Sequence, residues 1–247
     1  MTTVQALLDE AHPIIQQAGA SFYFLPQTAA RAEALGIDVY RFYFLGRGGV
    51  LGDVDPCVVS SAFGYFEPGL VAHMWDTARA VLPPREAARA HLECAHELGR
   101  ARLETVPGLA ELCDAASAVV AAADADGMAL FAGVRAQPVP EDLPGRAIHL
   151  LVALRELRGS AHLLAVRASG LSTKVAHYLA RPEAFALFGW KAHEAPVVQD
   201  STHRQLAAAE ALTDALVAPA FDVLDGSARR AFLDALRAVG PALTSPS

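Results

Sequence analysis

The stretch that decides the fold runs from Ile148 to Leu164 and reads IHLLVALRELRGSAHLL. Its apolar residues recur with the period of a helix, and its polar residues interrupt them at helical spacing. Because successive helical residues are about 100° apart, one stripe of this helix holds Arg155, Arg158, Gly159 and His162. Glu156 falls on another side, together with His149. The stretch therefore predicts a long helix with one polar stripe on a largely apolar surface.

The polar stripe is the first candidate for a functional site. A glycine in a helix interior costs about 1 kcal/mol relative to alanine, so Gly159 indicates close approach by a ligand or a neighbouring helix. In the functional interpretation, Arg155 and Arg158 hold an anionic or polar ligand, and His162 is its hydrogen-bond or proton partner. If the protein is an enzyme, His162 is the expected catalytic acid or base. A structural ion-pair network uses the same residue types, and the sequence leaves both interpretations open.

Most other segments also carry apolar residues at helical spacing, which predicts an all-α protein. Helices are expected over residues 27–35, 56–66, 85–103, 107–123, 146–168, 172–180 and 202–217, with a last helix capped by Ser227. Three prolines within residues 137–144 interrupt this pattern with a stiff stretch. We therefore expect two helical domains, residues 1–136 and 145–247. The helices beyond residue 202 are the expected place for the pairing of subunits in a homodimer.

Composition and charge narrow the function classes. Hydrophobic residues make up 53% of the 247-residue chain, yet no apolar run approaches the roughly 18 residues of a spanning helix. The first residues do not resemble a secretion signal, and three widely spaced cysteines favour reduced thiols, so a soluble, cytoplasmic protein is expected. The net charge of -7 argues against strong non-specific attraction to nucleic acid, although a local basic patch remains compatible with it.

Two further segments are candidates for ligand contacts. The run Leu45–Gly52 contains four glycines and Arg47, and its backbone amides can approach a ligand closely, although spacing alone favours a flexible connection between helices. It lacks the pattern of a nucleotide-binding loop. Downstream, Phe63 and Phe66 offer aromatic surface for an apolar pocket, with core packing as the default interpretation.

A metal site is not expected. The segment His91–Arg100 contains histidine and cysteine, the usual transition-metal ligands. Helical spacing places His91 on an apolar stripe and His96 on another side, with Glu93 and Arg100. Arg100 also stands where a zinc-protease motif requires a second histidine.

Three segments, in this order, resemble a bacterial family of helix-turn-helix proteins distantly related to MarR-type regulators. They are Gly46–Arg47 with Leu51–Gly52, then Phe63–Pro68, then Leu154–His162. The resemblance implies an N-terminal helical domain followed by a winged-helix-like half. Residues 209–221 are similar to the helices with which MarR-type proteins dimerise. A small-molecule ligand and DNA are the partners that the resemblance implies.

The chain departs from this family after Gly189–Trp190. There the family places a recognition-type helix and a wing, whereas residues 191–200 lead directly into the helix that begins near Thr202. A winged reader needs a helix for the major groove and basic residues for the phosphates. The shortened segment therefore puts DNA binding in question, although Arg167, Lys174 and Arg181 make the preceding region locally basic.

Two functions of different classes follow. The first is a ligand-responsive transcriptional regulator, dimeric through its terminal helices. The second is a repurposed, non-DNA-binding protein that binds or transforms a metabolite in specialised biosynthesis. In either case the expected ligand-binding residues are Arg47, Phe63, Phe66, Arg155, Arg158, Gly159 and His162.

Overall fold

The computed structural model describes residues 3–245, and within them every regular element is helical. The elements up to the proline-rich segment are α1 (Val4–Ala18), α2 (Pro26–Ala34), α3 (Val39–Gly48), a 3₁₀ turn (Gly49–Leu51), α4 (Pro56–Phe63), α5 (Pro68–Arg79), α6 (Pro84–Leu103), α7 (Leu109–Ala122) and α8 (Ala129–Arg135). Those after it are α9 (Leu143–Ala168), α10 (Thr173–Ala180), two 3₁₀ turns (Pro182–Ala184 and Ala192–Glu194), α11 (Asp200–Phe221) and α12 (Gly226–Thr244). The predicted all-α fold is confirmed.

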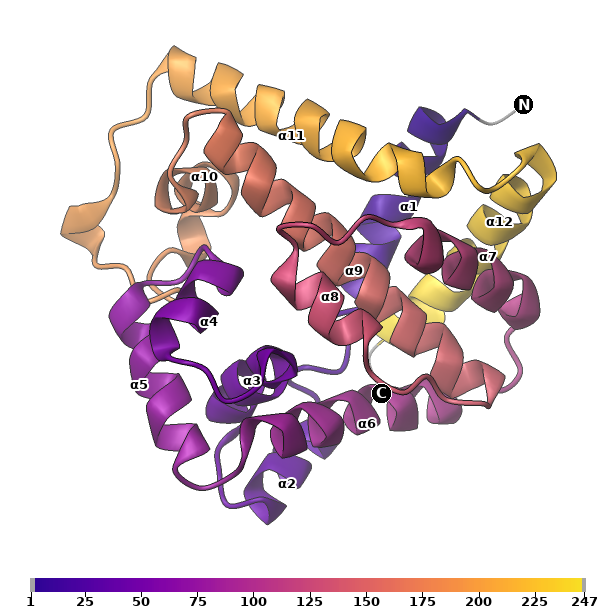
Figure 1. Ribbon diagram of the computed structural model, residues 1–247, viewed down its shortest axis with the longest axis horizontal. Coiled ribbons are helices and arrows are strands. Elements are labelled where there is room, and N and C mark those ends of the chain that lie inside the picture. The colour runs from indigo at the N-terminus through magenta and orange to yellow at the C-terminus, as the bar shows by residue number, and fades with distance from the viewer. Residues whose placement is uncertain (1–2, 246–247) are drawn as a thin grey trace.

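Helix α9 is the central element, and the other helices surround it (Figure 1). It packs against α1, α6, α7, α8 and α11. The Asp142 side chain caps it by accepting a hydrogen bond from the backbone N–H of Gly145. Most of its residues from Ala147 to Leu157 are buried, which explains why its apolar positions lie on nearly all sides.

The hydrophobic core extends through almost the whole described chain. Its buried members run from Leu7 in α1 to Leu243 in α12, and α9 contributes Ala147, Ile148 and Leu150–Leu154. A smaller cluster joins the end of α9 to α10 and α11 through Val166, Ala176 and Ala209. The expected division into residues 1–136 and 145–247 stays a prediction, since both parts contribute to the larger core.

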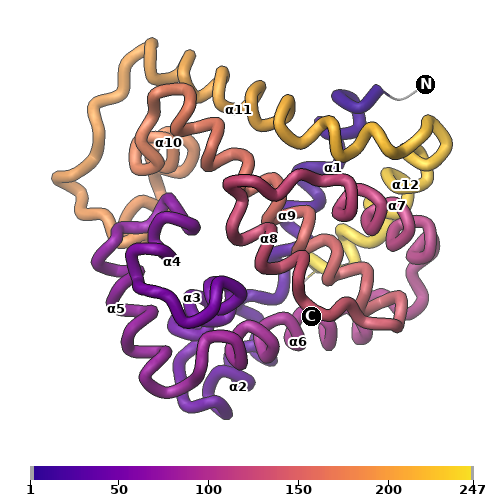
Figure 2. The backbone as a smooth tube through the Cα atoms, in the orientation of Figure 1, coloured from indigo at the N-terminus to yellow at the C-terminus, as the bar shows by residue number. Residues whose placement is uncertain are grey.

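Different helices form the two ends of the molecule. Figure 2 shows α4, α5 and α10 at one end and α7 and α12 at the other. The terminal helices are packed within their own chain, α11 on α9 and α1, and α12 on α1 and α7. No helix among residues 3–245 combines the length and the apolar character needed to cross a membrane.

One local interpretation of the sequence is wrong. The glycine-rich run is not a flexible connection, because Gly46 and Gly49 let α3 and its 3₁₀ turn pack directly on α6. A Cβ atom on Gly46 would lie 2.5 Å from Cβ of His91, and one on Gly49 would lie 2.0 Å from the carbonyl oxygen of Pro84.

Candidate functional site

A buried ion cluster joins α3 to α9. Nε and Nη2 of Arg47 donate to the two carboxylate oxygens of Glu156, each at 2.9 Å. Nη1 of Arg155 donates to Oε1 of the same carboxylate at 2.7 Å. Burial alone would raise the pKa of Glu156, which is only 1% exposed, but the two guanidiniums outweigh burial and hold that pKa below its ordinary value. Glu156 is therefore an anion paired with Arg155, and the expectation that it lies apart from the arginine stripe is wrong.

Aromatic rings surround this cluster. The guanidinium of Arg47 lies 4.4 Å from the centroid of the Phe63 ring, and that of Arg155 lies 5.2 Å from the Tyr23 ring. The rings of Phe63 and Phe66 are 6.1 Å apart. Four of the predicted ligand-binding residues thus lie in one neighbourhood, and they come from α3, the end of α4, the turn after α4, and α9: Arg47, Phe63, Phe66 and Arg155.

A second polar cluster joins α9 to α1 and α11. Nη2 of Arg158 donates to Glu210 at 2.8 Å, and its Nε donates to Nδ1 of His12 at 3.2 Å. Nδ1 of His162 lies 2.9 Å from Oγ1 of Thr213. Burial lowers the pKa of His162 and favours the neutral ring. Arg158 and His162 both reach Glu210 and so do not share the carboxylate that Arg155 uses.

Gly159 lies on α9 between these two clusters. A Cβ atom built there would meet no heavy atom within 4 Å, so no neighbouring helix requires a glycine at this position. The ring of Tyr65 stacks on that of His162, with the two centroids 6.3 Å apart, so Tyr65 lies on the side of α9 that carries His162. The hydroxyl of Tyr65 is buried and has no hydrogen-bond partner among the described residues. The open space beside Gly159 is therefore flanked by polar groups.

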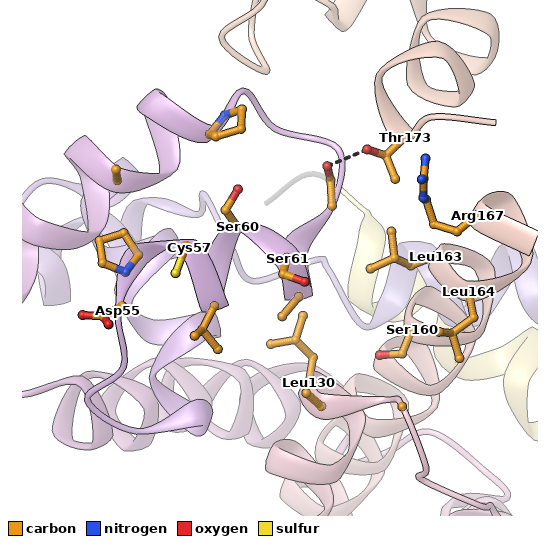
Figure 3. A pocket seen from close by; sticks show the side chains of 18 of the residues that line it. Asp55, Cys57, Ser60, Ser61, Leu130, Ser160, Leu163, Leu164, Arg167 and Thr173 are labelled. Atoms are coloured by element: carbon orange, nitrogen blue, oxygen red, sulfur yellow. Dashed lines mark hydrogen bonds between the residues drawn. The ribbon is translucent and has the colours of Figure 1, made fainter. Parts of the chain in front are cut away.

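A larger groove lies between the α4–α5 pair and helices α8, α9 and α10 (Figure 3). Its volume is about 1340 Å³, and apolar atoms form most of its wall. Its polar side chains include Asp55, Ser60, Ser61, Ser160, Arg167 and Thr173. None of the seven predicted ligand-binding residues lines it. The sequence alone does not predict the groove, because these residues come from separate segments and form no motif.

The groove borders a unit of two helices, α9 and α10, that a short turn joins. The four residues Ser169–Ser172 connect the two helices, and Gly170 adopts a φ of 80°, which favours glycine. The Ser172 hydroxyl caps α10 by accepting from the backbone N–H of Val175. Oγ1 of Thr173 donates to the carbonyl of Gly64 at 2.9 Å, across the groove wall (Figure 3). A ligand in the groove would therefore touch both helices of this unit.

The surface beyond α10 carries few free positive charges. Residues 181–199 contain two 3₁₀ turns and no strand, so the described chain has no wing here. Nζ of Lys174 lies 3.2 Å from Glu194 and 4.4 Å from the centroid of the Trp190 ring. Arg181 is exposed at the end of α10. The predicted shortening of the reader region agrees with this arrangement.

The histidines of α6 occupy the positions that helical spacing predicts. His91 lies among aromatic rings, and burial lowers its pKa to about 3. His96 bonds through its two nitrogens to Glu93 and to His149, each at 3.1 Å. Among residues 3–245, no three histidine, cysteine or acidic side chains are grouped so that they could hold a metal ion.

One comparison with known proteins finds a match for this chain. A profile of the helix-turn-helix family matches residues 9–246, almost the whole chain. Neither the curated proteins nor the solved structures include a match. Membership of such a family points to DNA-binding regulation in general. On the extent of this match, the chain belongs to the helix-turn-helix family.

Proposed function

We propose that this protein is a small-molecule-binding member of its family, related to MarR-type regulators, and that it acts as a ligand-responsive transcriptional regulator. The observation that carries the proposal is the groove, because its wall contains both helices of the α9–α10 unit. Ser160, Leu163 and Arg167 of α9 line it together with Thr173 of α10. A ligand that binds one position of α10 more tightly than another shifts the population toward that position.

The most exposed candidate for contact with DNA is the α10 region. Arg181, directly after α10, and Lys191 beyond it are both exposed. Phosphate contacts of this kind make binding weaken steeply with salt.

We further propose a homodimer formed through α11 and α12, supported by exposed apolar side chains at Leu216 and Val223.

Fluorescence anisotropy with duplex DNA from upstream of the protein's own gene tests the regulator. We expect salt-dependent binding at low ionic strength. Ser61 is exposed and lines the groove, so the substitution Ser61→Trp should obstruct part of the groove without disturbing the core. This variant should mimic ligand occupancy and change DNA affinity several-fold.

The matched control is Ser201→Trp, an exposed serine in the first turn of α11 that does not line the groove. It should leave DNA affinity unchanged. If both variants bind DNA as the unmodified chain does, the groove does not control binding. If the unmodified chain shows no salt-sensitive binding at low ionic strength, the regulator proposal fails.

A second candidate is a metabolite-binding protein or enzyme that has lost DNA binding. The net charge of -7 and the engagement of Lys174 by Glu194 favour it, because both weaken attraction to phosphate. In an enzyme, His162 is the proposed acid or base, since burial lowers the pKa of its half-buried ring and so leaves the ring neutral and able to accept a proton. Absence of DNA binding together with stabilisation by a metabolite in a thermal-shift screen would select this candidate.

A further inference from the structure

The groove between the α4–α5 pair and helices α8, α9 and α10 carries no net charge. Of the residues that line it, only Asp55 and Arg167 are charged, and their charges cancel. Figure 3 shows them on opposite sides of the groove. Both are exposed to solvent, and neither forms an ion pair with residues 3–245. An exposed charge attracts an opposite charge only weakly, so the groove favours no ionic ligand.

Ser160 of α9 carries a buried hydroxyl without a protein partner. One serine and three threonines are buried among residues 3–245, and the three threonine hydroxyls all take part in hydrogen bonds. Ser160 is only 8% exposed and lines the groove, yet its hydroxyl forms no hydrogen bond with the described residues. Such a group has lost most of its hydration without gaining a protein contact. The Ser160 hydroxyl is therefore available to a molecule in the groove.

A second free hydroxyl faces the groove from the other wall. Figure 3 shows the hydroxyls of Ser61 on α4 and Ser160 on α9 directed into the groove from its two sides. Within residues 3–245, Ser61 also has no hydrogen-bond partner, and neither has Ser60 beside it. A serine hydroxyl can both donate and accept a hydrogen bond. The groove therefore matches hydroxyl and carbonyl oxygens placed at separate points of a ligand.

The rest of the groove suits a bulky hydrocarbon body. Its volume of about 1340 Å³ exceeds the roughly 300–1,000 Å³ of ordinary small-molecule sites. Val58 and Leu164 line it and are 43% and 37% exposed. A ligand that covers these side chains removes apolar surface from water, which stabilises the complex. A single aromatic ring would leave most of this wall uncovered.

We infer that the groove binds a bulky, uncharged molecule with a mostly hydrocarbon body and several hydroxyl or carbonyl oxygens, as in a hydroxylated steroid. This inference rests on the proposed function, because it names the ligand class of the same groove. The body covers Val58 and Leu164, and the oxygens form hydrogen bonds with the hydroxyls of Ser61 and Ser160. A small anion lacks the body, and a pure hydrocarbon leaves the Ser160 hydroxyl without a partner.

Isothermal titration calorimetry of the full chain with three steroids tests this ligand class. Hydrocortisone is uncharged and carries hydroxyl groups, progesterone has the same ring body without hydroxyls, and hydrocortisone hemisuccinate adds a carboxylate. We expect hydrocortisone to bind about 10-fold more tightly than progesterone, because progesterone offers fewer hydrogen bonds to the groove. The hemisuccinate should bind no more tightly than hydrocortisone, since the charged groups of the groove are exposed.

Two substitutions locate the steroid in the groove. Ser160→Ala removes one hydroxyl that has no protein partner, so it should weaken hydrocortisone binding about 10-fold without lowering the melting temperature. Ser61→Trp obstructs part of the groove and should weaken binding at least as much. The matched control is Ser117→Ala on α7, an exposed serine that does not line the groove, and it should leave the affinity unchanged.

Several outcomes would overturn the ligand class. They are no binding of hydrocortisone up to its solubility limit, equal affinities for hydrocortisone and progesterone, a hemisuccinate that binds more than about 10-fold more tightly than hydrocortisone, and an unchanged affinity in Ser160→Ala. The titrations contain no DNA, so they test the ligand class apart from the regulator. Hydrocortisone binding without any DNA binding supports the ligand class and refutes the regulator. A change of DNA affinity in Ser61→Trp without hydrocortisone binding does the reverse.

Discussion

Two helical glycines occupy opposite environments. Gly159 in α9 has open space where a Cβ would stand, whereas Gly46 in α3 faces Cβ of His91 at 2.5 Å. Alanine is the better helix former, so Gly159→Ala should stabilise the protein by about 0.5–1 kcal/mol. Gly46→Ala should destabilise it by about 1–3 kcal/mol, because the added methyl group overpacks the contact with α6. Urea denaturation of both variants measures these changes.

The comparison fails if the two alanine variants shift stability in the same direction. The sequence alone also did not reveal which of the two glycines has a close neighbour. An interior glycine between charged residues drew attention to Gly159, yet the cost of a helical glycine does not say what fills the space beside it. The close approach of a neighbouring helix is found at Gly46, where spacing alone predicted a flexible connection.

At the scale of elements, Glu156 is the link between α3 and α9. It accepts hydrogen bonds from Arg47 and Arg155 and is almost fully buried. Glu156→Gln removes the only carboxylate of the cluster and leaves two buried guanidiniums without an anion. We expect a loss of about 3–5 kcal/mol in the free energy of unfolding. Thermal or urea denaturation measures it.

The control is Glu210→Gln on α11. Glu210 also pairs with an arginine, Arg158, but its side chain is 49% exposed. Solvent screens such a pair, so the loss should be about 1 kcal/mol or less. Equal losses in the two variants would show that burial does not set the strength of the Glu156 cluster.

Helices were easier to predict than their contacts. Proline and glycine mark most helix ends, and Asp142, Pro144 and Gly170 bound α9 within a few residues of the expected range. The pairing of Arg47 with Glu156 joins positions 109 residues apart, and periodicity within one helix contains no information about it. Helical spacing even placed Glu156 away from Arg155, because it describes where side chains leave the backbone and not where long side chains end.

At the scale of the whole molecule, the groove is a second feature that patterns within single helices do not predict. Ser61 of α4, Ser160 of α9 and Thr173 of α10 meet there only because α4 and α5 lie beside α10 (Figure 2). Each is an ordinary surface or helix residue in the sequence. The all-α class and the resemblance to a helix-turn-helix family were accessible from local patterns, whereas a cavity between helices depends on their packing.

The pH dependence of stability is also a property of the whole core, because the buried histidines His12, His91 and His149 come from three different helices. Burial is the main cause that lowers the pKa of His12 and of His149 from 6.5 to about 4, and that of His91 to about 3. In the folded state these rings are neutral between pH 6.5 and 4, while in the unfolded chain they take up protons in that interval. The unfolded state therefore binds more protons, so stability falls as the pH is lowered through this window.

Between pH 7 and pH 5, each of these histidines should reduce the free energy of unfolding by about 2 kcal/mol. Urea denaturation at a series of pH values should therefore show a steep decline well above the range where carboxylates such as Glu156 become protonated. His149→Gln should flatten the decline, since it removes one of these titrating rings. The matched variant His73→Gln, at an exposed position of α5, should leave the slope unchanged. A stability that stays constant from pH 7 to pH 5 would mean that these rings are not neutral and buried in the folded protein.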